Sequence, residues 1–256
     1  MKIYRGIAQG SAEWFRIRLG LPTASNFDKI MTPRTRKLSA SWKGYACQLI
    51  AERLLNIPTE TIKNIEWMER GKLLEPEAVQ RFEVVNDVVT VPITFIKTDD
   101  GTMGCSPDRG IFGSDPDRPL KVLECKCPAA HTHLQYLLFG HGTDEKSQDK
   151  YKCQVQGQMM IAEVDEAIFY SYHPAGPALT LKTPRDDSFI KDLRSAIDEF
   201  NDKLHEYHEL AKKLGDWQAF QEVVTPVDAE YGEVPQGVWE VPQGVDEFLD
   251  RGEDFF

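Results

Sequence analysis

Apolar residues recur at helical spacing in several parts of the chain. Ser11 can cap a short helix over AEWFRIRLG that ends at Gly20, and another helix begins near Thr23. A longer helix is predicted where apolar side chains recur three and four positions apart, at Tyr45, Leu49, Ile50 and Leu54. Further helices are predicted over residues 63–85, with an interruption at Pro76, and over 147–163 and 186–214.

The middle of the chain instead has the patterns of strands separated by turns rich in Gly, Asp and Pro. The predicted strands are VVTVPITFIKT, TMGCSPD, RGIFG and LKVLECKC, followed after a helix by AIFYSYH and LTLKT. The order of helices, strand meander, helix, two strands and helix predicts a mixed α/β fold, with a central sheet flanked by helices.

The composition changes after Phe220. Two copies of a seven-residue stretch, EVPQGVW and EVPQGVD, occupy 233–239 and 240–246. Two such copies cannot build a repeat domain, which needs at least three packing units. We therefore expect one domain over residues 1–221 and an acidic tail over 222–256 that is extended or disordered.

Charge and cysteine usage narrow the class of protein. The net charge is −11, but residues 222–256 carry −9 of it, leaving −2 on the rest, so clustered cations can still bind nucleic acid. The 5 cysteines are odd in number and show no C-x-x-C spacing, which favours free thiols in a reducing compartment. No apolar run is long enough to span a membrane and no signal peptide is recognisable, so a cytoplasmic location is expected.

Charged residues on an apolar strand are the strongest chemical signal. In LKVLECKC, Glu124 and Lys126 share one face with Val122, because side chains alternate along a strand. The strand that ends at Asp108 can fold back beside Glu124. Two carboxylates and a carbonyl suit Mg²⁺, and Lys126 could position or deprotonate a water for phosphodiester hydrolysis. A buried salt-bridge cluster is the alternative from these residues alone.

Five motifs, in order, resemble those of the phage lambda exonuclease (YqaJ-type) branch of the PD-(D/E)-x-K nucleases. They are EWFRIRLGLPTAS (13–25), GKLLEPEA (71–78), S-P-D ending at Asp108, E-C-K-C-P from Glu124, and YKCQVQ (151–156). Together they cover roughly residues 11–160. The resemblance implies a restriction-endonuclease-like core.

The resemblance also implies roles for individual residues. Asp108 and Glu124 would be metal ligands with the backbone carbonyl of Cys125, and Lys126 would be the catalytic lysine. Glu75 would reach the metal from one helix, and Gln154 would face the site from another. Pro76 follows Glu75 directly and biases it away from helical geometry, so Glu77 is the substitute for Glu75. The 5′-phosphate of a DNA end would be bound by Arg18 and Ser25.

The function implied is that of an Mg²⁺-dependent exonuclease, with Mn²⁺ as a possible substitute, which degrades the 5′-ended strand of linear duplex DNA and leaves 3′ overhangs. A ring-shaped homotrimer and a single-strand annealing protein as partner are implied too. The alternatives are an inactive DNA-binding or scaffold protein on the same fold and a related endonuclease. An iron–sulfur relative is disfavoured, because no cysteine follows Cys153.

The acidic tail allows three hypotheses. It can be a solubilising segment, a DNA mimic that covers a cationic groove, or a peptide that docks on a replication or recombination protein. Docking is preferred to mimicry, because the chain ends in Asp-Phe-Phe and terminal aromatic residues suit a pocket.

Overall fold

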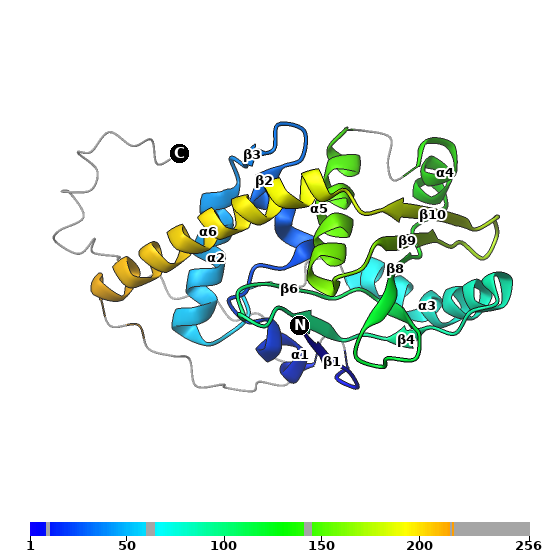
Figure 1. Ribbon diagram of the computed structural model, residues 1–256, viewed down its shortest axis with the longest axis horizontal. Coiled ribbons are helices and arrows are strands. Elements are labelled where there is room, and N and C mark those ends of the chain that lie inside the picture. The colour runs from blue at the N-terminus through cyan, green and yellow to red at the C-terminus, as the bar shows by residue number, and fades with distance from the viewer. Residues whose placement is uncertain (9–10, 60–64, 141–144, 216, 218–256) are drawn as a thin grey trace, which may run out of the picture. The chain divides into compact units, whose positions relative to one another are not determined.

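The computed structural model describes residues 1–8, 11–59, 65–140, 145–215 and 217 (Figure 1). Its centre is a five-stranded sheet in the order β10-β9-β8-β7-β4. The strands are β4 (Val91–Pro92), β7 (Arg109–Phe112), β8 (Pro119–Lys126), β9 (Glu166–Ser171) and β10 (Leu179–Pro184). Only β8 and β9 run parallel; the other neighbours are antiparallel. The predicted mixed α/β class is confirmed.

Helices cover both faces of this sheet. On one face, α3 (Ile65–Asn86) packs Ala78 and Phe82 against Leu123 and Cys125 of β8. On the other, Val122 packs with apolar residues of α5 (Glu145–Ala162) and α6 (Asp187–Lys213). Strand β8 is thus buried on both sides, and its alternating side chains divide between two cores as the sequence predicted.

The N-terminal part of the chain completes the α5 side. It contains α1 (Ala12–Arg18), the 3₁₀ helix η1 (Ala24–Lys29) and α2 (Trp42–Leu55), which lies against α6. The Ser11 hydroxyl accepts a hydrogen bond from the Trp14 amide at 3.2 Å, so the predicted cap of α1 is confirmed. Helix η1 packs closely on α5, because Gly157 leaves room for the ring of Phe27.

Two small sheets stand beside the central one. One has three strands in the order β1 (Lys2–Tyr4), β5 (Phe95–Lys97) and β6 (Gly104–Cys105). The other pairs β2 (Met31–Thr32) with β3 (Lys37–Leu38). The predicted strand ending at Asp108 is therefore wrong in extent, because β6 ends at Cys105. The chain then crosses to the central sheet, where β7 begins at Arg109.

One expectation about the helices was wrong, and one helix was missed. Helix α3 continues through Pro76, which is exposed, because the following turn is held on the sheet by buried Ala78 and Phe82. Helix α4 (Ala130–Phe139) was not predicted at all. Its buried residues, His133 and Tyr136, are polar at one end and form no apolar periodicity.

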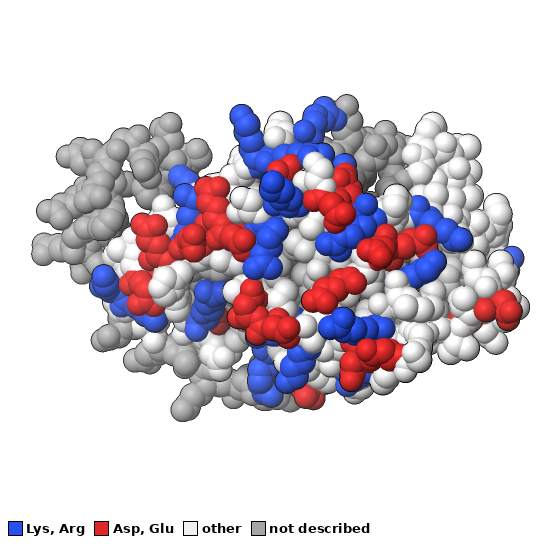
Figure 2. Space-filling view, in the orientation of Figure 1, with Lys and Arg blue, Asp and Glu red and all other residues white. Residues whose placement is uncertain are grey.

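Charged side chains of both signs are interspersed on the face seen in Figure 2. All five cysteines are free thiols, as predicted. No helix in the described ranges is long and apolar enough to cross a membrane. The predicted tail, 222–256, lies outside the described residues.

Candidate active site

The two acidic residues singled out from the sequence meet at the start of β7. Strands β7 and β8 pair Arg109 with Leu123, and continuing this register by one residue places Asp108 beside Glu124. Oδ2 of Asp108 accepts a hydrogen bond from the Cys125 amide at 2.6 Å. Asp108 is thereby fixed to the backbone of the strand that carries Glu124 and Lys126.

Glu124 is buried, with 4% of its side chain exposed, and both of its carboxylate oxygens accept hydrogen bonds. Oε1 accepts from Nζ of Lys126 at 2.5 Å and from Nε2 of Gln154 at 2.7 Å. Oε2 accepts from Nε2 of Gln158 at 2.6 Å. The carboxylate is therefore held in one orientation by one cation and two amides.

Burial and mutual repulsion dominate the electrostatics. Burial raises the pKa of Asp108 well above its ordinary value, and the neighbouring charge of Glu124 raises it further. Burial alone would lower the pKa of Lys126, but Glu124 and Asp108 outweigh it and raise this pKa. Lys126 is therefore a cation at neutral pH, which suits it to orient a water or a phosphate oxygen rather than to accept a proton.

Glu75 lies close enough to this cluster to interact with it electrostatically. Burial raises the pKa of Glu75, whereas the positive charges of Arg109 and Lys126 lower it. Its side chain lines a neighbouring hollow with Arg109. Glu77, the substitute considered from the sequence, is exposed and accepts a hydrogen bond from the hydroxyl of Tyr172 instead. The continuous helix through Pro76 thus orients Glu75, not Glu77, toward the site.

The residues expected to bind a 5′-phosphate lie on the wall of the same cavity. It has a volume of about 290 Å³ and is lined by Arg18, Ser25, Asp108, Glu124, Lys126, Gln154 and Gln158, with Trp14, Ser106 and Tyr151. The guanidinium of Arg18 stacks on the Trp14 ring at 4.2 Å and donates to Oγ of Ser106 at 2.6 Å. Arg18 is therefore held beside the acidic cluster.

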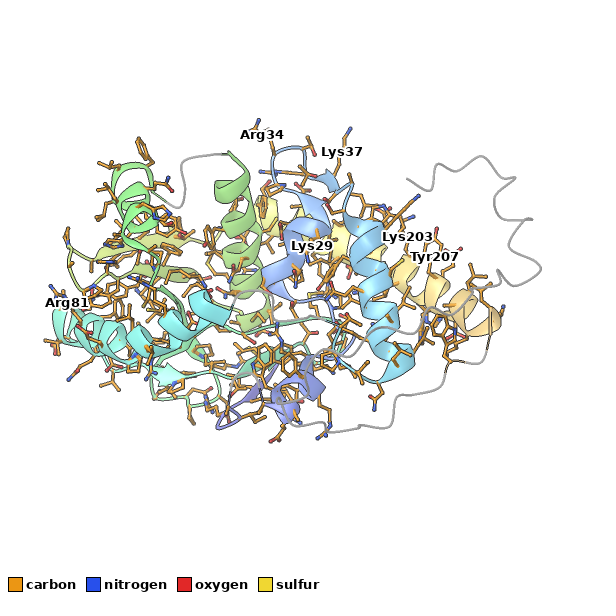
Figure 3. All side chains as sticks on the ribbon, turned by 180° about the vertical axis from the view of Figure 1, so that it is seen from behind. Lys29, Arg34, Lys37, Arg81, Lys203 and Tyr207 are labelled. Carbon is orange, nitrogen blue, oxygen red and sulfur yellow. The ribbon has the colours of Figure 1, made fainter. Side chains whose placement is uncertain are left out.

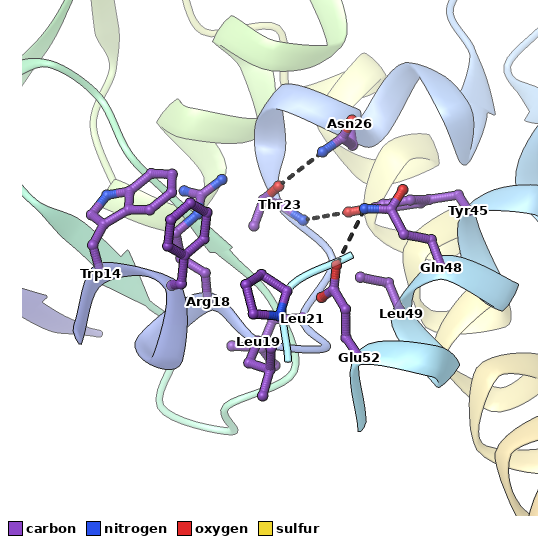
Figure 4. Close-up of a pocket in the computed structure, with 12 residues that line it drawn as sticks. Trp14, Arg18, Leu19, Leu21, Thr23, Asn26, Tyr45, Gln48, Leu49 and Glu52 are labelled. Carbon is purple, nitrogen blue, oxygen red and sulfur yellow. Dashed lines mark hydrogen bonds between the residues drawn. The ribbon is translucent and has the colours of Figure 1, made fainter. Parts of the chain in front are cut away.

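A smaller pocket adjoins this cavity and shares Trp14 and Arg18 with it (Figure 4). Glu52 of α2, which is 6% exposed, accepts a hydrogen bond from the Gly20 amide at 2.9 Å. Arg53 donates from Nε to the Gly20 carbonyl at 2.9 Å. Gly20 has a φ of +65°, which favours glycine, so α2 fixes the turn that follows Arg18.

Further cations lie on the face seen in Figure 3. Lys29 projects from η1, and Arg34 and Lys37 project from the hairpin of β2 and β3. Arg36 of the same predicted cationic loop is paired instead with Asp192 of α6, at 2.9 Å. Part of the loop thus supplies surface charge, and part of it anchors the hairpin to α6.

The residues present fit a hard divalent cation. Among the described residues, no three His, Cys, Asp and Glu side chains are gathered closely enough to hold a metal ion. Asp108 and Glu124, with the Cys125 carbonyl, would still give Mg²⁺ oxygen ligands, and this ion usually keeps several waters. Burial and the charge of Glu124 raise the pKa of Asp108. A bound cation would counteract this effect, because a nearby positive charge favours the ionised carboxylate.

Ser106, Trp14 and Gln158 were not assigned to the site from the sequence. Gln158 shares a helix face with Gln154, four residues away, and this spacing was its only signal. Trp14 likewise precedes Arg18 by four residues on α1. Ser106 is the first residue of the S-P-D motif, but its contact with Arg18 could not be predicted, because the two residues meet only through the fold.

A family model for the YqaJ-like viral recombinase domain matches residues 13–165, more than half of the chain. The chain belongs to this family. No curated protein matches the YqaJ-like chain in sequence. Membership confirms the resemblance read from the five motifs, and it supports a nuclease role in recombination.

Solved structures agree with this assignment. The alkaline exonuclease LHK-Exo from Laribacter hongkongensis is 27% identical, with a TM-score of 0.67; the match covers 79% of the YqaJ-like chain and 97% of LHK-Exo. Its complex with dAMP gives the same TM-score at 26% identity. A phage-related exonuclease from Haemophilus somnus 129PT is 15% identical at a TM-score of 0.56, covers 76% and 96%, and shows the fold alone. The restriction-endonuclease-like class is confirmed.

Proposed function

We propose that this protein is an Mg²⁺-dependent exonuclease that degrades the 5′-ended strand of linear duplex DNA and leaves 3′ overhangs. One observation carries the proposal. Asp108, Glu124 and Lys126 line the same cavity as Arg18 and Ser25, so groups suited to a metal and groups suited to a terminal phosphate face one space. The complex of LHK-Exo with dAMP supports a deoxynucleotide-sized product.

Each residue has a distinct task in this proposal. Asp108, Glu124 and the Cys125 carbonyl hold the cation, with Glu75 supporting them from α3. The bound cation would stabilise negative charge that develops on the phosphoryl oxygens. Lys126, a cation beside Glu124, orients the attacking water or the scissile phosphate. Gln154 fixes the Glu124 carboxylate, and Arg18 and Ser25 bind the 5′-phosphate, Arg18 through charge-assisted hydrogen bonds.

The same proposal includes the assembly and the partners. The family resemblance implies a homotrimer that encloses DNA and a single-strand annealing protein that binds the 3′ overhang. It also implies that Mn²⁺ can replace Mg²⁺. Light scattering at micromolar protein should give three times the chain mass of 29.1 kDa. A monomer would remove the ring and leave the nuclease chemistry intact.

One assay tests the activity directly. Linear duplex with 5′-phosphate, linear duplex with 5′-hydroxyl and closed circular duplex are incubated with Mg²⁺ or with EDTA. We expect nucleotide release from linear DNA only, faster from the 5′-phosphate end, and none in EDTA. Cleavage of the circle would indicate an endonuclease. Binding of ends without release in any metal would indicate an inactive scaffold.

A further inference from the structure

Gln158 combines a bond to the acidic cluster with an unused polar atom. Its side chain is 1% exposed and lines the cavity that contains Glu124 and Lys126. Nε2 donates to Oε2 of Glu124 at 2.6 Å. Oε1 is buried and has no hydrogen-bond partner among the residues that the structure describes.

The chemistry of the amide fixes which atom faces Glu124. A carboxylate oxygen at 2.6 Å requires a donor, so the NH₂ group must point toward Glu124 and the carbonyl oxygen must point elsewhere. A buried acceptor left without a donor costs folding stability, and most buried polar groups are therefore paired. The unpaired Oε1 indicates a donor that joins the site on binding, and a water is the smallest donor of this kind.

Gln156, two residues away on α5, shows how a structural glutamine is used in this chain. It is 3% exposed. Its Nε2 donates to the Pro184 carbonyl at 3.0 Å, and its Oε1 accepts from the Asp186 amide at 2.9 Å. Both of its amide atoms are satisfied, and they join α5 to the end of β10 and the start of α6. Gln158 differs in binding a carboxylate and in keeping one acceptor unused.

We propose that Gln158 is a positioning residue for the metal site. Its NH₂ group holds Oε2 of Glu124, as Gln154 holds Oε1, so the carboxylate presents its remaining lone pairs to a cation in a fixed direction. When a hydrated cation is bound, the Gln158 carbonyl oxygen would accept a hydrogen bond from one of its waters. This inference rests on the proposed metal-dependent function and adds a residue that holds the ligand rather than the substrate.

Metal binding without DNA tests the proposal. Mn²⁺ titrations followed by the electron paramagnetic resonance signal of the free ion are run on wild type, Gln158→Met, Gln158→Ala and the control Gln156→Met. We expect Mn²⁺ affinity about 10–100-fold weaker in both Gln158 variants, the range found when groups that orient metal ligands are removed. Gln156→Met should lose thermal stability but keep wild-type affinity. Saturating metal should restore much of the nuclease rate of the Gln158 variants.

The outcomes separate this inference from the proposed function. If wild type binds Mn²⁺ and folded Gln158 variants bind it equally well, Gln158 is structural only and the inference fails alone. If Gln156→Met weakens binding as much, the effect belongs to α5 in general and the inference fails too. If wild type binds no Mn²⁺, the metal site itself is wrong. If Gln158→Met does not fold, Gln158→Ala is used instead, because the smaller side chain causes no steric clash and leaves space for water beside Glu124.

Discussion

Replacing Asp108 by Asn should stabilise the metal-free protein while removing its activity. The register of β7 and β8 places Asp108 beside Glu124, and like charges on directly opposite strand positions are destabilising. Two unit charges about 5 Å apart repel by about 3 kcal/mol at an effective dielectric constant of about 20. Lys126 offsets part of this repulsion, since it contacts Glu124.

Asn preserves the local bonding, because its carbonyl oxygen can accept the hydrogen bond from the Cys125 amide that Oδ2 of Asp108 accepts. The net gain is then about 1–2 kcal/mol, after the attraction to Lys126 is subtracted. For a chain of this size, that raises the melting temperature by about 2–8 °C. By this reasoning the paired carboxylates lower the stability of the metal-free chain, and a bound cation should reverse the effect.

The pH dependence has a definite sign. Burial and Glu124 raise the pKa of Asp108 in the folded state, so the fold loses stability as the pH rises from the ordinary Asp value toward the raised one. Below about pH 4, the ordinary value for Asp, the residue is protonated in both states and the advantage of Asn disappears. The benefit should therefore be largest at pH 8 and shrink as the pH falls.

Thermal melts in EDTA and in Mn²⁺ measure both effects. Wild type should gain stability when Mn²⁺ is added, because a ligand that binds only the folded state stabilises it, and Asp108→Asn should not. Asp115→Asn is the matched control: Asp115 is exposed, and its Oδ1 accepts from the Asp117 amide at 2.8 Å. A less stable Asp108→Asn in EDTA, or an equal Mn²⁺ response in both proteins, would refute the reasoning.

Three further substitutions test the other parts of the site. Lys126→Met should slow nucleotide release by roughly 10²–10³-fold while DNA-end binding survives, because Lys126 stabilises charge in the transition state. Equal turnover would exclude this role. Arg18→Ala should lose about 1.5–3 kcal/mol of the preference for 5′-phosphorylated over 5′-hydroxyl ends, measured by competition between the two substrates. A wild type without this preference would contradict the assignment of Arg18. Glu52→Gln should weaken the same preference several-fold, because Glu52 fixes the Gly20 amide in the turn after Arg18. Release from saturating 5′-hydroxyl ends should be unchanged, because Glu52 does not line the cavity of the acidic cluster, and a slower rate there would contradict this.

Local pattern was sufficient for most of the fold. The alternation along β8 correctly predicted that Glu124 and Lys126 lie on one face of the sheet and Leu123 and Cys125 on the other. Successive side chains of a strand point to opposite faces. The long helix 186–214 matches α6, whose Asp186 caps it by accepting from the Phe189 amide at 3.0 Å. The alternation in β8 and the start of α6 are both encoded in short stretches of sequence, so they could be predicted without knowing which distant residues pack against them.

Long-range packing decided what local pattern missed. Pro76 favours a helix break, but Ala78 and Phe82 hold the next turn against β8, and this packing outweighs the lost backbone hydrogen bond. The change of sheet between Cys105 and Arg109 was invisible for the same reason, since β6 pairs with β5 and β7 pairs with β8. Strand pairing depends on partners that are far away in sequence.

The site is built from separate parts of the chain, and this has a consequence for its chemistry. Glu124 and Lys126 lie at the end of β8, Asp108 at the start of β7, and the amides of Gln154 and Gln158 reach them from α5. Lys126, Gln154 and Gln158 all donate hydrogen bonds to the Glu124 carboxylate, so its orientation is set before any ligand arrives. Such preorganisation avoids reorientation during the reaction, which is where polar sites gain most of their effect on rate. The energetic strain of the metal-free cluster and the readiness of the site for a cation therefore have one cause, the packing of acidic side chains between β8 and α5.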